Sequence, residues 1–160
     1  MVAFDPSRYC DIQDNPMAPR PIAIASDHAG LDLKKLLVEE LKAMGEAVLD
    51  LGTQGPESVD YPDFGDALAK AIIDGRAARG VLVCGTGIGI SIAANRHKGI
   101  RAAHCRDTTD ARFARLHNDA NVIALGARTS GIEVAKDCLR AFLSTEFEGG
   151  RHQRRVDKLG

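Results

Sequence analysis

From residue 21 onward, the chain alternates short apolar runs with amphipathic segments, and this alternation restricts its possible folds more than any other feature. The apolar runs have strand length, and the segments between them place large apolar residues at helical spacing. Strands separated by helices favour a parallel sheet covered on both faces. Because such crossovers are right-handed, we predict an α/β fold, a three-layer α/β/α sandwich around a doubly wound, Rossmann-like sheet of five parallel strands. The predicted strands are 22–25, 47–49, 81–83, 100–103 and 122–125, and the predicted helices are 33–44, 64–75, 92–95, 108–117 and 135–142.

The two ends of the chain differ from this alternating region. Residues 1–20 hold three of the six prolines and show no apolar periodicity, so we expect a flexible N-terminal arm. Met17 stands just before the first predicted strand and is an alternative start of the natural chain. We expect residues 21–160 to form a single domain, since a chain of this length can bury one core but not two. Its last part, 145–160, reads as a polar, basic tail.

Composition and charge argue against several classes of partner. The formal net charge of −1 gives no reason to expect nucleic acid. No run of about 18 apolar residues could span a membrane, and the N-terminus lacks the apolar core of a signal peptide. The four cysteines are scattered without a Cys-x-x-Cys pair, so we expect a reduced, cytoplasmic protein rather than a disulfide framework or a zinc knuckle.

The stretch from Cys84 to Ser91, Cys-Gly-Thr-Gly-Ile-Gly-Ile-Ser, carries the strongest chemical signal. It places a thiol at the end of a predicted strand, in front of a glycine-rich turn that leads into a helix. Free N–H groups in such a turn favour an anion, and the same field favours the thiolate form of a cysteine. The stretch fails the dinucleotide fingerprint, because position 90 is Ile, and it lacks the Gly-Lys-Ser/Thr of a P-loop. A simple tight turn, with Cys84 as inert packing, is the remaining alternative.

Other polar residues follow the predicted strands at the same edge of the sheet, where ligands bind in folds of this kind. Asp27 either caps the next helix or holds a substrate hydroxyl and moves a proton. His28 is a candidate for anion binding, and Arg128, in a Gly-Ala-Arg turn after the fifth strand, is a candidate anion clamp. We interpret Cys105 and Cys138 as core residues.

His117 and Asn118 end a predicted helix that runs back toward the start of the next strand. They should therefore lie at the opposite edge of their own subunit, so that His117 can work with Cys84 only across a subunit interface. The helix dipole alone is an alternative reason for a histidine at this position. The tail arginines are either a solvated end or a phosphate site. We interpret His97 and His104 as structural or surface residues, and the sequence leaves the role of His152 open. No spacing typical of a metal site is present in the sequence.

Taken together, these segments resemble the type B ribose-5-phosphate isomerases, in the family shared with the galactose-6-phosphate isomerase subunits. The resemblance runs in family order from about residue 22 to 156. Its matching pieces are Ser26–Gly30, Asp60–Pro62, Cys84–Ser91, Asn95, Gly99–Arg101, His117–Asp119, Gly126–Arg128 and Gly149–Arg155.

The resemblance implies a homodimer, or a dimer of dimers, whose active sites are built from two subunits. It also implies a cofactor-free, metal-free isomerase that interconverts ribose 5-phosphate and ribulose 5-phosphate through a cis-enediolate, in the pentose phosphate pathway. Some members of the family use a glutamate as the base. This chain has Cys84 at that position and resembles the cysteine branch.

The resemblance also implies a role for each matched residue. Cys84 would be the base, and His117 of the partner subunit would open the sugar ring. The enediolate would be stabilised by the amides of Gly85, Gly87 and Gly89, together with Thr86 and Ser91. Asp27 and Asn118 would hold sugar hydroxyls, Tyr61 would line the pocket, and His28, Arg128, Arg151 and Arg155 would grip the phosphate.

The substrate stays open at this level. Allose 6-phosphate, galactose 6-phosphate and a tetrose 4-phosphate are alternatives, because pocket depth sets the chain length that fits. A non-catalytic module that binds a phosphosugar or a nucleotide is an alternative of another class. A thiol redox protein is a third, and the absence of a resolving cysteine close in sequence to Cys84 argues against it.

Overall fold

The computed structural model describes residues 18–160. Most of the predicted arm, 1–20, including Cys10 and Met17, lies outside the described residues. The predicted fold is confirmed: the sheet has five parallel strands in the order β2-β1-β3-β5-β4. The strands are β1 (Ile22–Ser26), β2 (Val48–Asp50), β3 (Arg79–Cys84), β4 (Ala102–His104) and β5 (Val122–Gly126).

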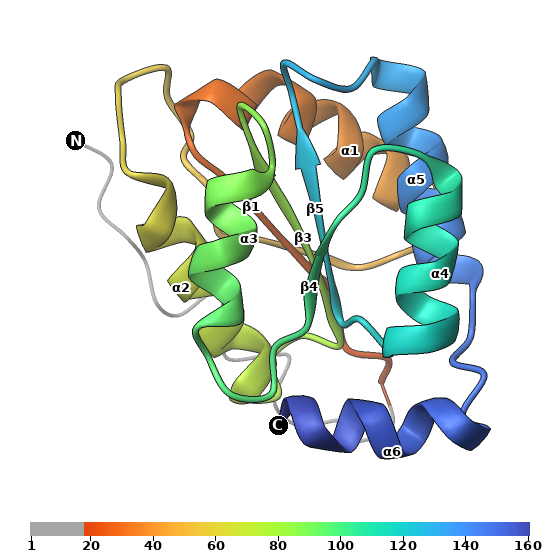
Figure 1. The fold of residues 1–160 in the computed structure, drawn as a ribbon. Helices are drawn as coiled ribbons and strands as arrows, with labels where there is room; N and C mark the ends of the chain where they lie inside the picture. Colours follow the sequence, from red (N-terminus) through yellow and green to blue (C-terminus); the bar gives the residue numbers. More distant parts are fainter. Residues whose placement is uncertain (1–17) are drawn as a thin grey trace.

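Helices cover both faces of this sheet, and α2 and α3 lie on one side of it with α1, α4 and α5 on the other (Figure 1). The two faces are set by alternation along the strands. In β1, Ile22 and Ile24 belong to the core under α1, α4 and α5, whereas Ala23 and Ala25 belong to the core under α2 and α3. The helices are α1 (Leu31–Ala43), α2 (Tyr61–Ile73), α3 (Ile88–Asn95), α4 (Thr108–Asn118), α5 (Ile132–Ser144) and α6 (Gln153–Val156).

Helices α1, α2, α3 and α5 begin earlier than the apolar pattern predicts, and α2 and α3 show the reason. Helix α2 begins at Tyr61, three residues before the first apolar marker, because Asp60 has the extended backbone of an N-cap and the proline that follows suits the first turn. Helix α3 begins at Ile88, directly after the glycine turn, with Gly87 in the left-handed conformation as its N-cap. The turn and the helix therefore form one continuous unit.

The end of the chain is more structured than a polar tail. Gly150–His152 and Asp157–Leu159 are 3-10 turns on either side of α6, and His152 and Val156 are buried. This segment lies beneath the end of the sheet where the strands begin (Figure 1). Two apolar side chains, Val156 and Leu159, in a mostly polar and basic sequence were too weak a pattern to predict it.

No helix among the described residues is long and apolar enough to cross a membrane.

Candidate active site

The turn after β3 holds the thiol of Cys84 against a backbone amide. The Gly87 N–H donates to Cys84 Sγ over 3.1 Å, and only 4% of Cys84 is exposed. Gly87 has φ +80°, and a Cβ there would lie 2.9 Å from the carbonyl carbon of Leu125 and 2.8 Å from Cδ2 of His104. Glycine is therefore required at position 87 both by the backbone conformation and by the lack of space. The N–H contact stabilises a negative charge on the sulfur.

The strand register places the polar residues after β1 beside this thiol. Ser26 pairs with Val83, so Asp27 is level with Cys84 on the neighbouring strand, at a strand spacing of about 4.8 Å. Asp27 is 6% exposed, and its Oδ1 accepts from the Gly30 N–H at 3.0 Å. The helix-capping role is thus present, and it occupies one of the two carboxylate oxygens.

A backbone amide determines the tautomer of His28. The Val59 N–H donates to His28 Nδ1 over 3.2 Å, so in the neutral ring the proton lies on Nε2. His28 can therefore donate a hydrogen bond from Nε2 to an oxygen in the site. The contact comes from the loop between β2 and α2, and nothing in the sequence pattern pointed to it.

Tyr61 lies against the first turn of α3. A Cβ on Gly89 would lie 2.7 Å from Cζ of Tyr61 and 3.1 Å from its hydroxyl, so the absence of a side chain at position 89 lets the ring approach the helix. Tyr61 is 41% exposed. It therefore lies beside the glycine turn, and its role in lining the pocket stays a prediction.

Arg128 brings a positive charge to the same turn. The backbone N–H of Arg128 donates to the Gly85 carbonyl at 2.8 Å. A Cβ on Gly85 would lie 3.5 Å from Nη1 of the Arg128 guanidinium. The side chain is exposed, so its donors can reach a ligand at the turn.

The two hydroxyl groups of the turn already make local contacts. Thr86 Oγ1 accepts from the Ile88 N–H at 3.3 Å, and Ser91 Oγ donates to the Ile88 carbonyl at 2.7 Å. Thr86 keeps its own hydroxyl hydrogen for a ligand. Ser91 would have to release Ile88 before it could donate to one.

The second group of predicted residues lies at the opposite edge of the sheet. Helix α4 ends at Asn118, and the Asn121 carbonyl that follows accepts from the Gly80 N–H near the start of β3. Because five residue steps separate Arg79 from Cys84 along β3, this edge is roughly 17 Å from Cys84. The structure therefore brings Asp27, His28, Tyr61, the Cys84–Ser91 turn and Arg128 together, and it places His117, Asn118, Arg151 and Arg155 elsewhere.

His117 is surrounded by side chains from distant parts of the chain. Its ring stacks on His152 with centroids 4.3 Å apart, and Phe113 packs on it at 4.7 Å. Glu148 Oε2 is 3.8 Å from Nε2 of each histidine. Burial, and then the positive charge that His117 can carry, lower the pKa of His152. His152 and Glu148 are the functional candidates that sequence reasoning left out, and only the matched segment Gly149–Arg155 drew attention to the histidine.

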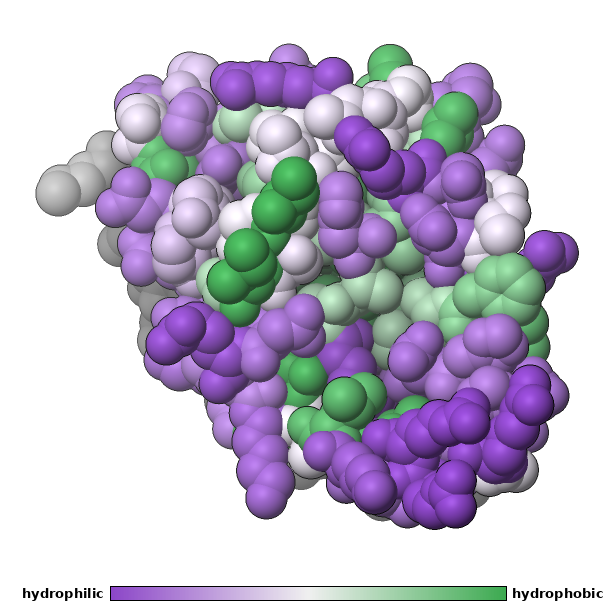
Figure 2. Space-filling model, in the orientation of Figure 1, coloured by the Kyte–Doolittle hydropathy of each residue, from purple (hydrophilic) through white to green (hydrophobic). Residues whose placement is uncertain are grey.

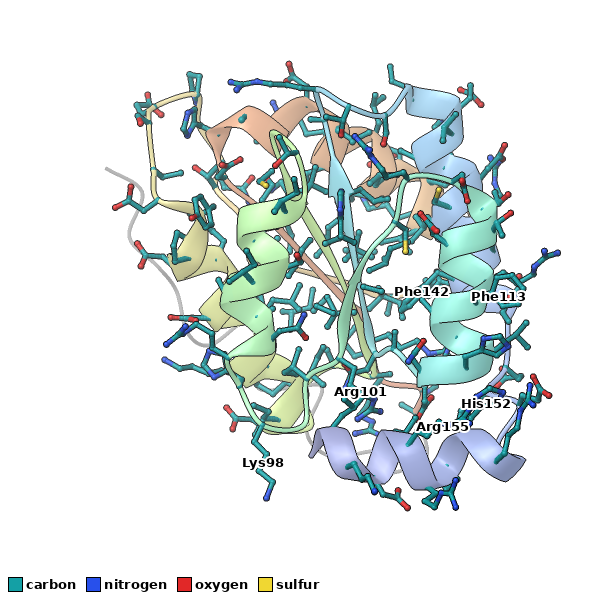
Figure 3. The ribbon with its side chains drawn as sticks, in the orientation of Figure 1. Lys98, Arg101, Phe113, Phe142, His152 and Arg155 are labelled. Atoms are coloured by element: carbon teal, nitrogen blue, oxygen red, sulfur yellow. The ribbon has the colours of Figure 1, made fainter. Side chains whose placement is uncertain are left out.

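Basic side chains flank this histidine pair, and Figure 3 shows His152, Arg155 and Arg101 at this end of the molecule. Arg101 is held by Asp119, with Nη2 and Oδ2 3.2 Å apart. Arg151 and Arg155 are exposed, and within the part of the chain that the structure describes neither has a carboxylate within 4 Å. Their guanidinium groups are therefore available to an anion.

The other described cysteines are core residues, as predicted. Cys105 and Cys138 are each 1% exposed. Burial raises the pKa of the Cys105 thiol to about 12 and that of Cys138 to about 11. Neither thiol is a candidate base near neutral pH.

Comparisons with known proteins show the family of this chain. Residues 22–159 match the ribose/galactose isomerase family. Ribose-5-phosphate isomerase B of Escherichia coli is 45% identical over 88% of this chain and 94% of its own, and the D-erythrulose-4-phosphate isomerase of Pectobacterium atrosepticum is 49% identical over 87% and 92%. A solved structure of ribose-5-phosphate isomerase B from Clostridium thermocellum superposes with a TM-score of 0.86 at 52% identity, over 88% of this chain and 95% of that one. The chain therefore belongs to the ribose/galactose isomerase family, and this membership makes it an aldose–ketose isomerase.

Proposed function

We propose that the protein interconverts ribose 5-phosphate and ribulose 5-phosphate, with Cys84 as the base and His117 of a second copy as the group that opens the ring. The observation that carries the proposal is the 3.1 Å contact between the Gly87 N–H and Cys84 Sγ, at a strand end that also bears Asp27, His28 and Arg128. A base of modest pKa beside amide donors is what proton abstraction next to a carbonyl requires.

The reaction needs one carbon-bound proton to move. In the open aldose, the Cys84 thiolate takes the proton from C2, the C–H electrons form the C1–C2 double bond, and the aldehyde oxygen becomes an enediolate oxygen. The thiol then returns the proton to C1 while the hydroxyl at C2 gives up its own proton and becomes the ketone. Amides of the 85–89 turn and the Thr86 hydroxyl stabilise the enediolate, and Asp27, through its oxygen that does not cap Gly30, holds a hydroxyl or moves the proton between the two oxygens.

The remaining groups hold the substrate in place. His28 donates from Nε2, the tautomer set by Val59. Arg128 lies at the glycine turn, and Arg151 and Arg155 of the second copy add planar donors suited to phosphate. Phosphate binding far from the reacting carbons positions C1 and C2 over the thiol.

A homodimer would bring the Cys84 edge of one copy beside the His117 edge of the other. The surface along β4 is suited to such an interface. A groove of about 580 Å³ runs between α3 and α4 from His104 to Asn118, and the exposed apolar residues Ile88, Ile92 and Phe113 lie on the two helices that border it (Figure 2). We assign this face to a second copy of the chain. A twofold axis perpendicular to the strands would reverse the direction of the partner's sheet and set its His117 edge beside Cys84, twice per dimer.

Proton NMR in D2O tests the proposed reaction. Purified protein is incubated with ribose 5-phosphate, and the Cys84→Ala variant is the control. We expect ribulose 5-phosphate to form with solvent deuterium at the exchanging carbon, and we expect neither event with the variant. If the six-carbon and four-carbon sugar phosphates also remain unconverted, the result favours a non-catalytic binding module.

A tetrose 4-phosphate is the second candidate substrate, because the Pectobacterium relative that is 49% identical is a D-erythrulose-4-phosphate isomerase. A four-carbon aldose phosphorylated at O4 has no free hydroxyl that could close a five-membered ring. His117→Ala should therefore slow the conversion of ribose 5-phosphate while sparing the tetrose phosphate. Comparison of kcat/KM for the two sugars, in wild type and variant, identifies the better substrate and tests the role of His117 in ring opening.

A further inference from the structure

Three potential metal ligands converge at the edge of the sheet opposite Cys84. A ring nitrogen of His117, a ring nitrogen of His152 and a carboxylate oxygen of Glu148 all lie within 4.8 Å of one another. They come from the end of α4 and from two points of the C-terminal segment, so spacing in the sequence could not reveal them. His152, labelled in Figure 3, is the buried member of this group.

His152 has an unused coordinating atom. The residue is 5% exposed, and among residues 18–160 its Nε2 has no hydrogen-bond partner. Glu148, the nearest carboxylate, is 3.8 Å away, which is too far for a hydrogen bond. A buried imidazole nitrogen without a partner loses free energy on folding unless something binds it.

The ligand set and the freedom of its members suit a metal ion. Two imidazoles and one carboxylate match the three-ligand sites of Zn²⁺, which bind at about 2.0–2.2 Å and leave a fourth position open. The two rings are stacked with 12° between their planes, so one must turn before both lone pairs can meet at one ion. The side chains of His117 and Glu148 are 37% and 56% exposed and have room to move toward the fixed His152.

We propose that His117, Glu148 and His152 form a binding site for Zn²⁺ or a similar late first-row divalent cation, and that its occupation inhibits the enzyme. The inhibitory part rests on the proposed function, because a metal ion on Nε2 of His117 blocks the group assigned to ring opening. Arg151 and Arg155 flank the cluster and repel a cation, so the site is one of moderate affinity rather than a permanent structural site. Catalysis itself requires no metal in this proposal.

Metal binding is tested by spectroscopy, with Co²⁺ as the probe and with no measurement of enzyme activity. A background with Cys10→Ser and Cys84→Ser removes the thiol outside the described residues and the thiol of the glycine turn, and Cys105 and Cys138 are buried. We expect visible d–d absorption of Co²⁺ and two paramagnetically shifted imidazole N–H signals. Glu148→Gln and His152→Gln should each weaken Co²⁺ binding by at least about tenfold, since each loses one of three ligands.

Two matched variants control for charge and for an unrelated histidine. Glu146→Gln removes an exposed carboxylate near the cluster, and His97→Gln removes the histidine that pairs with Asp66 over 2.8 Å. Both should bind Co²⁺ as the parent does. Equal binding by Glu148→Gln, His152→Gln and the parent, with all three folded by circular dichroism, would overturn the site.

Inhibition is tested separately in the protein with Cys84 intact. Zn²⁺ should lower the turnover of wild type, and EDTA should restore it while leaving the metal-free enzyme unchanged. Glu148→Gln should need at least about tenfold more Zn²⁺ for the same inhibition. Equal inhibition of both proteins would locate the zinc effect at a thiol and refute the inhibitory role. Binding by spectroscopy together with full activity of His117→Ala would instead refute the proposed ring opening and leave the metal site standing.

Discussion

The two edges of the sheet are built in different ways. At the Cys84 edge, backbone groups and glycines within a few residues of each other make the environment of the thiol, and the neighbouring strands add Asp27 and Arg128 by register. At the opposite edge, side chains from α4 and the C-terminal segment meet, and His117 and His152 touch only in the folded chain. The residues of the first edge can therefore be predicted from the sequence, whereas those of the second edge come together only in the folded chain.

The largest expected effect comes from Cys84. Cys84→Ser should lower kcat by about 10²–10⁴-fold, because it removes the proposed base, while the affinity for ribose 5-phosphate changes little. Steady-state kinetics and calorimetric binding separate the two quantities. Cys138→Ala, which removes a buried thiol on the far face of the sheet, should keep kcat. A Cys84→Ser enzyme with normal kcat would remove the thiol from the mechanism.

The second largest effect is expected at the glycine turn. It tests whether the backbone geometry of this turn creates the environment of the Cys84 thiol. Gly87→Ala must accept φ +80° and a Cβ 2.9 Å from the Leu125 backbone, whereas Gly45→Ala must accept φ +82° with nothing within 4 Å. We expect Gly45→Ala to cost about 1–2 kcal/mol of unfolding free energy and to keep full activity. Gly87→Ala should cost more and lose activity, because the amide that contacts Cys84 moves. Urea unfolding and turnover measure both, and equal behaviour of the two variants would contradict this account of the turn.

Mixing two inactive chains tests whether the edges work together across a dimer. In a hybrid of Cys84→Ala and His117→Ala chains, one of the two sites holds both intact residues. Random pairing of equal amounts should therefore return about a quarter of the wild-type sites. The measurement is turnover after denaturant-assisted exchange, with native mass spectrometry to show that hybrids have formed. Verified hybrids without activity would mean that His117 and Cys84 do not share a site.

The sequence allowed the strands and the thiol turn to be predicted for physical reasons that are local. The residues of β1 and β3 are almost all apolar because both faces of the sheet are covered, and glycines mark the turn where no side chain fits. The contact of Val59 with His28 and the stacking of His152 on His117 could not be predicted, because each contact joins segments that are about 30 residues or more apart in the sequence. The helical ending at Gln153–Val156 was missed because its packing depends on a single buried valine.

The smallest expected effect comes from the core, where the Cys105 thiol is buried. Burial raises the pKa of Cys105 from an ordinary 9.0 to about 12, so in the folded chain the thiol stays protonated while the unfolded chain releases its proton above pH 9. Proton release from the unfolded state alone lowers the free energy of unfolding between pH 9 and 12, and the stabilising contribution present below pH 9 is lost as pH rises.

Urea unfolding at pH 6.5, 7.5, 9 and 10.5 checks this sign. Wild type should lose stability with rising pH more steeply than Cys105→Ala, which has no thiol to titrate at that position. The slopes should coincide below pH 8, where neither state of the wild-type protein loses the proton. Parallel curves above pH 9 would mean that Cys105 titrates alike in both states. That outcome would contradict the effect of burial on the Cys105 thiol.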